Sequence, residues 1–253
     1  MFDVFARYWW QFVIAAVLSY CVGSVNFAVI FSRLIKKSDV RTVGSGNPGT
    51  TNMYRVFGLR MGVLTLVCDV LKGVICCLVT YFSLLGLGSE AATQAEYFAG
   101  LFAVLGHVFP AMYRFKGGKG VATTIGVMAC VQPILMLCCI LPMFAVILLT
   151  DRMSVMSLLL SVFMIVWTWT MLLPQIGLFC CVMLTVMFAV VIFAHRHNLV
   201  RLLTGKENSM GIRRALRGKG DHHLQVLKER ETRNQAEQID SSDDGNTDEM
   251  PTR

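Results

Sequence analysis

The stretch YWWQFVIAAVLSYCVGSVNFAVIF, residues 8–31, contains no charged residue and decides the class of fold. A membrane-spanning helix needs about 20 consecutive apolar residues, whereas the apolar part of a cleaved signal peptide has roughly 7–15. The stretch also opens with Tyr8, Trp9 and Trp10, a grouping typical of the membrane–water interface. The sequence therefore predicts an uncleaved membrane-spanning segment near the amino terminus.

Charged residues are scarce over the first three quarters of the chain and common afterwards. Residues 1–195 contain 12 Lys/Arg and 6 Asp/Glu, whereas residues 196–253 contain 11 and 10. This excludes a soluble or disordered protein and predicts a membrane-embedded domain over residues 1–207. Residues 208–253 are predicted to form a charged cytoplasmic tail with a disordered acidic end. Cationic loops beside a membrane account for the net charge of +7, so no nucleic-acid partner is predicted.

The topology follows from hydropathy and from the distribution of Lys and Arg. Further spans are predicted over residues 60–85, 95–113, 153–173 and 175–194, with a longer apolar stretch over residues 120–150. The first loop is rich in Lys and Arg and residues 83–96 have none, which places the first loop in the cytoplasm. The charged tail is also expected in the cytoplasm, and counting back from it through the last two spans places residues 151 and 152 there too. Both ends of residues 120–150 are then cytoplasmic, so this stretch crosses twice and turns near Gln132 and Pro133. The prediction is an all-α integral membrane protein with about seven transmembrane helices, a periplasmic amino terminus and a cytoplasmic carboxyl terminus.

The nine cysteines point to neither a disulfide framework nor a metal site. Six of them form adjacent pairs at residues 76–77, 138–139 and 180–181, inside apolar runs, and no CxxC spacing occurs. Such cysteines behave as small apolar residues in a membrane helix. No metal and no cofactor are predicted.

The first of three polar clusters on the predicted cytoplasmic side is GSGNPGTTNMYR, residues 44–55. Its glycines allow successive backbone N–H groups to turn toward one anion, and Arg55 adds a guanidinium suited to phosphate. A flexible glycine-rich loop with one membrane-proximal arginine is the alternative.

The second cluster is GHVFPAMYRFKGGKGVAT, residues 106–123. It differs from a Walker A motif because Tyr113 and Gly120 stand where that motif has Gly and Ser/Thr. A KGGKG loop that opens a helix nevertheless offers amides, a helix amino terminus and ammonium groups to an anion. An ordinary basic membrane loop is the alternative, and His107 is as well suited to packing as to ligand binding.

The third cluster is HRHNLVRLLTGKE, residues 195–207, which follows the last span. His195 and Asn198 share a helix face at i, i+3, and Arg201 is placed to pair with Glu207. A histidine-rich helix end that compensates the helix dipole is the alternative. Asp69 and Lys72, at i, i+3 within the second span, are expected to face inward as a pair, either as part of a site or as a structural element.

These three stretches, in this order, resemble the three motifs of the bacterial acyl-phosphate:glycerol-3-phosphate acyltransferases, the PlsY family. The likeness extends over residues 10–207. It implies a multi-pass enzyme of the bacterial inner membrane, with its active site facing the cytoplasm, that transfers a fatty acyl group from acyl phosphate to the 1-hydroxyl of sn-glycerol 3-phosphate. The implied products are lysophosphatidic acid and phosphate, in phospholipid biosynthesis. The implied partners are glycerol 3-phosphate, long-chain acyl phosphate, membrane lipid and the soluble enzyme that forms acyl phosphate.

The resemblance also assigns roles to residues. The catalytic group would comprise Arg55, Lys119, His195, Asn198 and Ser154. Substrate and phosphate binding would involve Ser45, Gly46, Asn47, Thr51, Asn52, Gly117, Gly118 and Gly120, and Glu207 would be structural.

One departure from the family pattern and two open questions remain on the sequence. Thr50 stands where the family has Ala, which adds a hydroxyl. Either His195 or the substrate phosphate can accept the proton of the hydroxyl. The alternative function is a membrane transporter of an organic phosphate, although no inverted repeat is visible.

Overall fold

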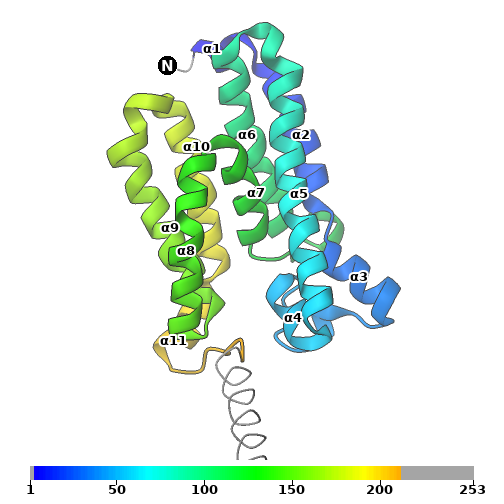
Figure 1. Cartoon of the computed structure of the whole chain (residues 1–253). Helices are drawn as coiled ribbons and strands as arrows, with labels where there is room; N and C mark the ends of the chain where they lie inside the picture. The colour runs from blue at the N-terminus through cyan, green and yellow to red at the C-terminus, as the bar shows by residue number, and fades with distance from the viewer. Residues whose placement is uncertain (1–2, 212–253) are drawn as a thin grey trace, which may run out of the picture. The chain divides into compact units, whose positions relative to one another are not determined.

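The computed structural model describes residues 3–211, and every regular element in this range is a helix (Figure 1). The predicted charged tail lies outside the described residues from residue 212 onward. The α-helices are α1 (Asp3–Arg7), α2 (Trp9–Ser24), α3 (Phe27–Lys36), α4 (Thr50–Phe57), α5 (Leu59–Leu84), α6 (Ser89–Val108), α7 (Val121–Val131), α8 (Pro133–Thr150), α9 (Met153–Trp167), α10 (Leu173–Ala194) and α11 (Arg196–Leu203).

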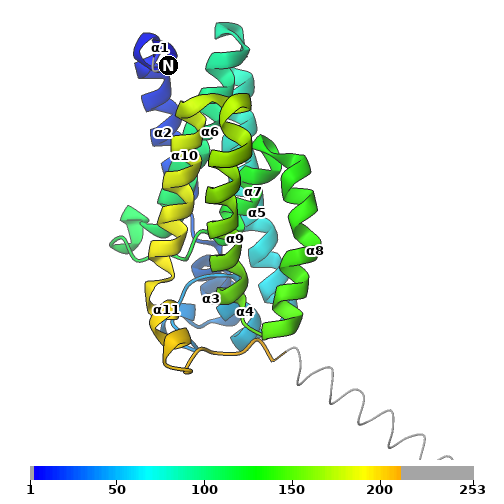
Figure 2. The same ribbon diagram turned by 90° about the vertical axis from the view of Figure 1, so that its left-hand side faces the viewer.

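Five helical stretches among the described residues are long and apolar enough to cross a membrane: Trp9–Lys36, Leu59–Leu87, Ser89–Tyr113, Pro133–Thr150 and Met153–Ala194. The last stretch contains both α9 and α10, which lie side by side and are joined at one end (Figure 2). Helix α7 is apolar but shorter than these. The chain is therefore a multi-pass membrane protein whose described residues form helices and no strands.

The turn predicted within residues 120–150 is confirmed. Helix α7 ends at Val131, Gln132 leaves the helical conformation, and Pro133 opens α8. Proline is favoured in the first turn of a helix, where no backbone N–H is needed, and it cannot continue the preceding helix. The proline therefore marks the boundary between the two helices.

The first predicted span is not one continuous helix. Helix α2 ends at Ser24, and α3 leaves the line of α2 at an angle (Figure 1). The break occurs because Val25 and Asn26 are extended and the Asn26 side chain accepts a hydrogen bond from Val29 N at 3.0 Å, which caps α3. The loop expected over residues 83–96 is also shorter, because α6 begins at Ser89.

Glycines let two pairs of helices touch backbone to backbone. A Cβ atom on Gly23 of α2 would overlap a carbonyl of α6, and one on Gly106 of α6 would overlap a carbonyl of α2. Gly73 of α5 and Gly126 of α7 form the same reciprocal arrangement. Small residues at membrane helix interfaces permit this close approach, which maximises van der Waals contact in a solvent as apolar as the helices.

The apolar core contains buried residues of α2, α6 and α10, among them Phe12 and Phe188. Helix α8 lies at the periphery and leaves Ile134, Leu137 and Leu141 between 67% and 79% exposed. Large exposed apolar side chains along a whole helix are typical of a surface that faces lipid.

Candidate active site

The three polar clusters contribute to one pocket, and the first and third of them lie at the same end of the bundle, at α4 and α11 (Figure 2). They line a pocket of about 120 Å³, together with residues from the start of α9. The predicted site residues in this lining are Ser45, Asn47, Thr51, Asn52, Arg55, Lys119, Gly120, Ser154, His195, Asn198 and Glu207. Gly46, Gly117 and Gly118 are predicted site residues that do not line it.

Three helices begin at this pocket. The first residues of α4, α7 and α9 all line it: Thr50 and Thr51, Val121 and Ala122, Met153 and Ser154. The first N–H groups of a helix lack intrahelical partners and carry partial positive charge, so helix amino termini attract anions. The backbone alone therefore makes the pocket favourable for phosphate.

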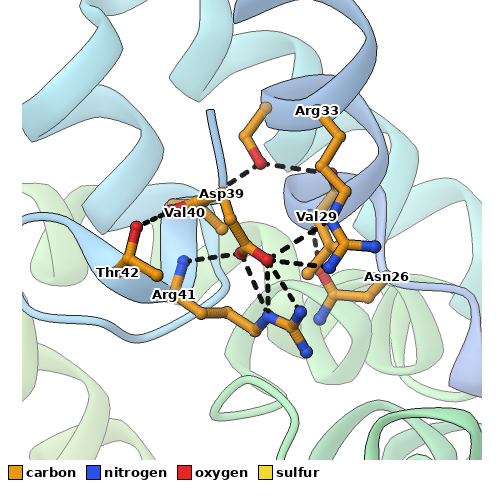
Figure 3. Close-up of polar contacts among 8 residues, drawn as sticks. Asn26, Val29, Arg33, Asp39, Val40, Arg41 and Thr42 are labelled. Atoms are coloured by element: carbon orange, nitrogen blue, oxygen red, sulfur yellow. Dashed lines mark hydrogen bonds and ion pairs between the residues drawn. The ribbon is translucent and has the colours of Figure 1, made fainter. Parts of the chain in front are cut away.

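The arginines in and beside the first loop differ in whether a carboxylate already pairs with them. Asp39 accepts hydrogen bonds from the guanidinium groups of Arg41 at 2.7 Å and Arg33 at 2.8 Å (Figure 3). The Arg41 guanidinium holds the pKa of the Asp39 carboxyl well below its usual range. Arg55, by contrast, contacts the carbonyl of Ser209 at 3.1 Å, and its buried Nε has no hydrogen-bond partner among residues 3–211. Arg55 therefore offers an uncompensated guanidinium to the pocket.

Asn52 shapes the first loop. Its Oδ1 accepts a hydrogen bond from Ser45 N at 2.9 Å, and its Nδ2 donates to Val40 O and Val43 O at 3.1 and 3.0 Å. Gly46 N also donates to Val43 O, at 3.1 Å. The Asn52 amide group therefore positions the loop and the Gly46 amide is paired within it, so the phosphate-binding role expected for Gly46 stays a prediction.

The second loop also pairs its glycine amides with the backbone. Gly117 N donates to Val108 O and Gly118 N donates to His107 O, both at 3.1 Å. A Cβ atom on Gly117 would overlap His107 O, and one on Gly118 would overlap the His107 imidazole. These glycines bring the loop against the end of α6 with their amides already paired, and the phosphate-binding role expected for Gly117 and Gly118 stays a prediction.

Lys119 supplies the cation of this second loop. Within residues 3–211 its ammonium forms no hydrogen bond or ion pair, and it lines the pocket. Burial lowers the pKa of Lys119 to about 8; the Glu207 charge opposes this shift, and the charges of Arg201 and Arg55 reinforce it. Near neutral pH the group is still mostly charged, and a partly desolvated ammonium interacts strongly with an anion.

Glu207 joins the third cluster to α9. Its carboxylate accepts hydrogen bonds from Ser154 Oγ and Asn198 Nδ2, both at 2.7 Å, and from Arg201 Nε at 3.0 Å. Burial raises the pKa of Glu207, but these three donors hold it below its usual range. The expected Arg201–Glu207 pair forms, and the carboxylate fixes two side chains of the pocket wall.

His195 is almost fully buried at the junction of α10 and α11. Its Nδ1 lies 2.8 Å from Val191 O. A carbonyl can only accept, so Nδ1 carries the hydrogen and Nε2 is left as the acceptor. Burial lowers the pKa of His195 to about 4, with the charge of Lys119 adding to the effect, so the imidazole is neutral at physiological pH.

Sequence reasoning left several pocket residues outside the predicted site, among them Thr50, Asp69 and His107. Thr50 Oγ1 is buried without a hydrogen-bond partner among the described residues. Asp69 and His107 reach the same pocket from α5 and α6. The sequence signal was present, since all three lie in the quoted clusters or in the intramembrane pair, but their convergence depends on contacts between helices.

One group of described residues, Cys77, Glu96 and Cys130, has ligand atoms within 4.8 Å of one another and can hold a metal ion. These residues come from α5, α6 and α7, so no short spacing in the sequence predicts the group. None of them lines the pocket.

Comparison with known proteins places this geometry in context. The family model described as Glycerol-3-phosphate acyltransferase matches residues 13–205. The Glycerol-3-phosphate acyltransferase of Clostridioides difficile (strain 630) is 38% identical over 205 residues, which cover 79% of this chain and 96% of that protein. Glycerol-3-phosphate acyltransferase 2 of Bacillus anthracis is 33% identical over 198 residues, which cover 78% and 98%.

Two solved structures are also similar. The crystal structure of PlsY, an integral membrane glycerol 3-phosphate acyltransferase, in its glycerol 3-phosphate form superposes with a TM-score of 0.71. It is 33% identical and covers 81% of this chain and 98% of its own. The lysophosphatidic acid form has a TM-score of 0.67 at 32% identity and covers 78% and 94%.

Proposed function

The chain belongs to the glycerol-3-phosphate acyltransferase family, and from this membership we propose the chemistry of its pocket. The chain is an acyltransferase of phospholipid biosynthesis that acylates glycerol 3-phosphate. The donor is acyl phosphate, the acceptor is the 1-hydroxyl, and the products are lysophosphatidic acid and phosphate. The transporter alternative is set aside, because the matching family and structures are acyltransferases.

The observation that carries this proposal is that Met156 lines both the polar pocket and an apolar groove. The groove, of about 340 Å³, lies between α8 and α9 and ends at Trp167. A molecule with a phosphorylated head and an acyl tail fits this junction. Met156 and Trp167 are separated by about 16 Å along a helix axis.

The cations explain how two phosphorylated substrates can meet. Each carries close to two negative charges near neutral pH, so their approach is repulsive. Arg55 and Lys119, with the amino termini of α4, α7 and α9, offset this repulsion. Because acyl phosphate is already activated, orientation and electrostatic stabilisation are the main tasks left to the protein.

The proton of the hydroxyl goes to the phosphate leaving group. The oxygen of the 1-hydroxyl attacks the acyl carbon, the bond from that carbon to the phosphate oxygen breaks, and the departing phosphate takes the proton. A phosphate with a second pKa of about 6 is a better base than His195, whose pKa is about 4. His195 Nε2 orients glycerol 3-phosphate by accepting a hydrogen bond from the neighbouring 2-hydroxyl, so the proton of the 1-hydroxyl stays directed at the phosphate.

The membrane arrangement completes the proposal. The helices cross the bacterial inner membrane seven times, with α7 and α8 as the two shorter crossings, the amino terminus in the periplasm and the pocket facing the cytoplasm. Reporters fused after Glu207 or within residues 34–58 should report cytoplasm, and one near Ser89 should report periplasm. A periplasmic result after Glu207 would contradict this topology.

The decisive experiment uses purified protein, radiolabelled glycerol 3-phosphate and two donors of equal chain length, acyl phosphate and acyl-CoA. Lysophosphatidic acid should form from acyl phosphate, with little turnover of acyl-CoA. Efficient use of acyl-CoA with no response to acyl phosphate would refute the donor assignment. In the same assay Leu160→Trp, which obstructs the groove, should shift the preference to shorter acyl chains, while the matched variant Ile75→Trp in a separate groove between α2 and α5 should not.

A further inference from the structure

A cluster of ionisable side chains, Asp69, Lys72 and His107, lies inside the membrane-spanning helices at the inner wall of the pocket, which Asp69 and His107 line. The Asp69 carboxylate is 2.9 Å from Lys72 Nζ and 3.6 Å from His107 Nδ1. All three residues are at most 4% exposed. Charged groups inside a membrane are costly to bury, so their presence calls for a functional explanation.

His107 connects this cluster to the Lys119 loop. Its carbonyl accepts the hydrogen bond from Gly118 N, and its imidazole fills the space where a side chain on Gly118 would lie. Lys119 is the next residue along the chain. The position of the imidazole therefore fixes where the backbone of Gly118, and with it the Lys119 ammonium, enters the pocket.

Lys72 connects the same cluster to the first loop. Its Nζ donates a hydrogen bond to Val25 O at 2.8 Å, at the break between α2 and α3. The next residue, Asn26, donates from Nδ2 to Pro48 O at 3.2 Å. A chain of contacts thus runs from the first anion-binding loop through the helix break to Lys72, Asp69 and His107, and on to the second loop.

We propose that Asp69, Lys72 and His107 are positioning residues that hold the two anion-binding loops at a fixed separation, with His107 setting the place of the Lys119 ammonium. The proposal rests on the function proposed above. Its consequence is that disturbing His107 weakens the affinity of the pocket for phosphate groups. A purely structural role would instead reduce the amount of active enzyme and leave affinity unchanged.

The test compares His107→Asn, Asp69→Asn and Gly118→Ala in the purified full-length protein. For each variant, KM for glycerol 3-phosphate, KM for acyl phosphate and inhibition by inorganic phosphate are measured. At least one KM should rise about tenfold, inhibition by phosphate should weaken by a similar factor, and kcat should fall less. Glu96→Gln, which alters a buried carboxyl of the same helix α6 away from the pocket, is the matched control and should change neither KM nor phosphate inhibition.

The opposite pattern overturns the proposal: a lower kcat with unchanged KM values and unchanged phosphate inhibition. If His107→Asn fails to fold, Gly118→Ala and Asp69→Asn decide, since the first adds one methyl group at the same contact and the second keeps the side-chain shape. The positioning proposal can be tested even if acyl phosphate is not the donor. In that case KM for glycerol 3-phosphate and inhibition by phosphate are measured with the donor that the enzyme does use.

Discussion

The two glycine-rich loops of the pocket look alike in sequence and are built in different ways. In the first loop, Gly44 and Gly46 adopt positive φ angles of 62° and 69°, so glycine is needed for the turn itself. In the second, Gly120 also has a positive φ of 82°, but Gly117 and Gly118 do not, and these two are needed because the end of α6 leaves no room for a side chain. A run of glycines beside a cation therefore indicates an anion site without telling which backbone groups bind the anion.

Removing the cation that each loop contributes is the strongest test of whether the two loops serve one purpose. Arg55→Ala and Lys119→Ala should each lower kcat/KM about 100-fold or more, roughly 3 kcal/mol, because a phosphate charge is left uncompensated in a partly dry site. Arg55→Lys should rescue poorly, since an ammonium lacks the guanidinium fork. Steady-state kinetics on variants that elute normally in gel filtration measure this. A variant that keeps more than about half of the activity would remove that residue from the site.

Substituting one glycine from each loop sharpens the comparison. Gly117→Ala places a Cβ on the backbone of α6, which cannot move aside, whereas a Cβ on Gly46 meets only Arg41 O at 3.1 Å. Gly46→Ala should cost about 1–2 kcal/mol for the left-handed conformation, and Gly117→Ala should cost more than that. Thermal unfolding in detergent, followed by circular dichroism, gives the ranking. A larger loss of stability for Gly46→Ala than for Gly117→Ala would contradict this ranking. It would mean that backbone conformation matters more than the space available for a side chain.

The pH profile separates the loops by the chemistry of their cations. Lys119 has a pKa of about 8, so raising the pH above this value removes its charge in the free enzyme, whereas arginine side chains are not deprotonated in proteins. We expect kcat/KM to fall up to about tenfold per pH unit above pH 8. Lys119→Arg should flatten this alkaline decline. His195, with a pKa of about 4, should add no acidic limb above pH 5. If kcat/KM of Lys119→Arg still declines at alkaline pH, the decline reflects the titration of a group other than Lys119.

The smallest effect is expected for an arginine that already has a partner. Arg33 is 54% exposed and pairs with Asp39 in the first loop. Exposed ion pairs contribute below about 1 kcal/mol, so Arg33→Ala should keep activity within about twofold. Arg55→Ala, assayed in parallel, provides the contrast within the same loop. A loss above fivefold for Arg33→Ala would show that the Asp39 contacts shape the pocket itself.

Local patterns were enough to predict several features. The proline turn between α7 and α8 follows from backbone geometry, and the Asp69–Lys72 and Arg201–Glu207 pairs follow from short spacings along the chain. The polar clusters also predicted which segments converge, because helix ends on one side of a membrane share a surface. These features depend on residues close in sequence or on the membrane plane.

Other features depend on partners far away in the chain and were not predictable. Asn26 breaks the first span, and its Nδ2 bonds Pro48, 22 positions later. The use of the Gly117 and Gly118 amides depends on how the loop folds back on α6. Neither contact has a periodicity or a spacing that marks it in the sequence.

The position of Met156, shared by the polar pocket and the apolar groove, has a kinetic consequence. With the donor tail in the groove as proposed, the rate depends on the concentration of glycerol 3-phosphate in solution. It depends also on the mole fraction of acyl phosphate among the membrane lipids. Adding inert lipid at constant total donor then lowers the rate, whereas diluting the whole suspension at constant glycerol 3-phosphate leaves turnover per enzyme unchanged. Flux into phospholipid therefore responds to the surface density of the donor in the bilayer.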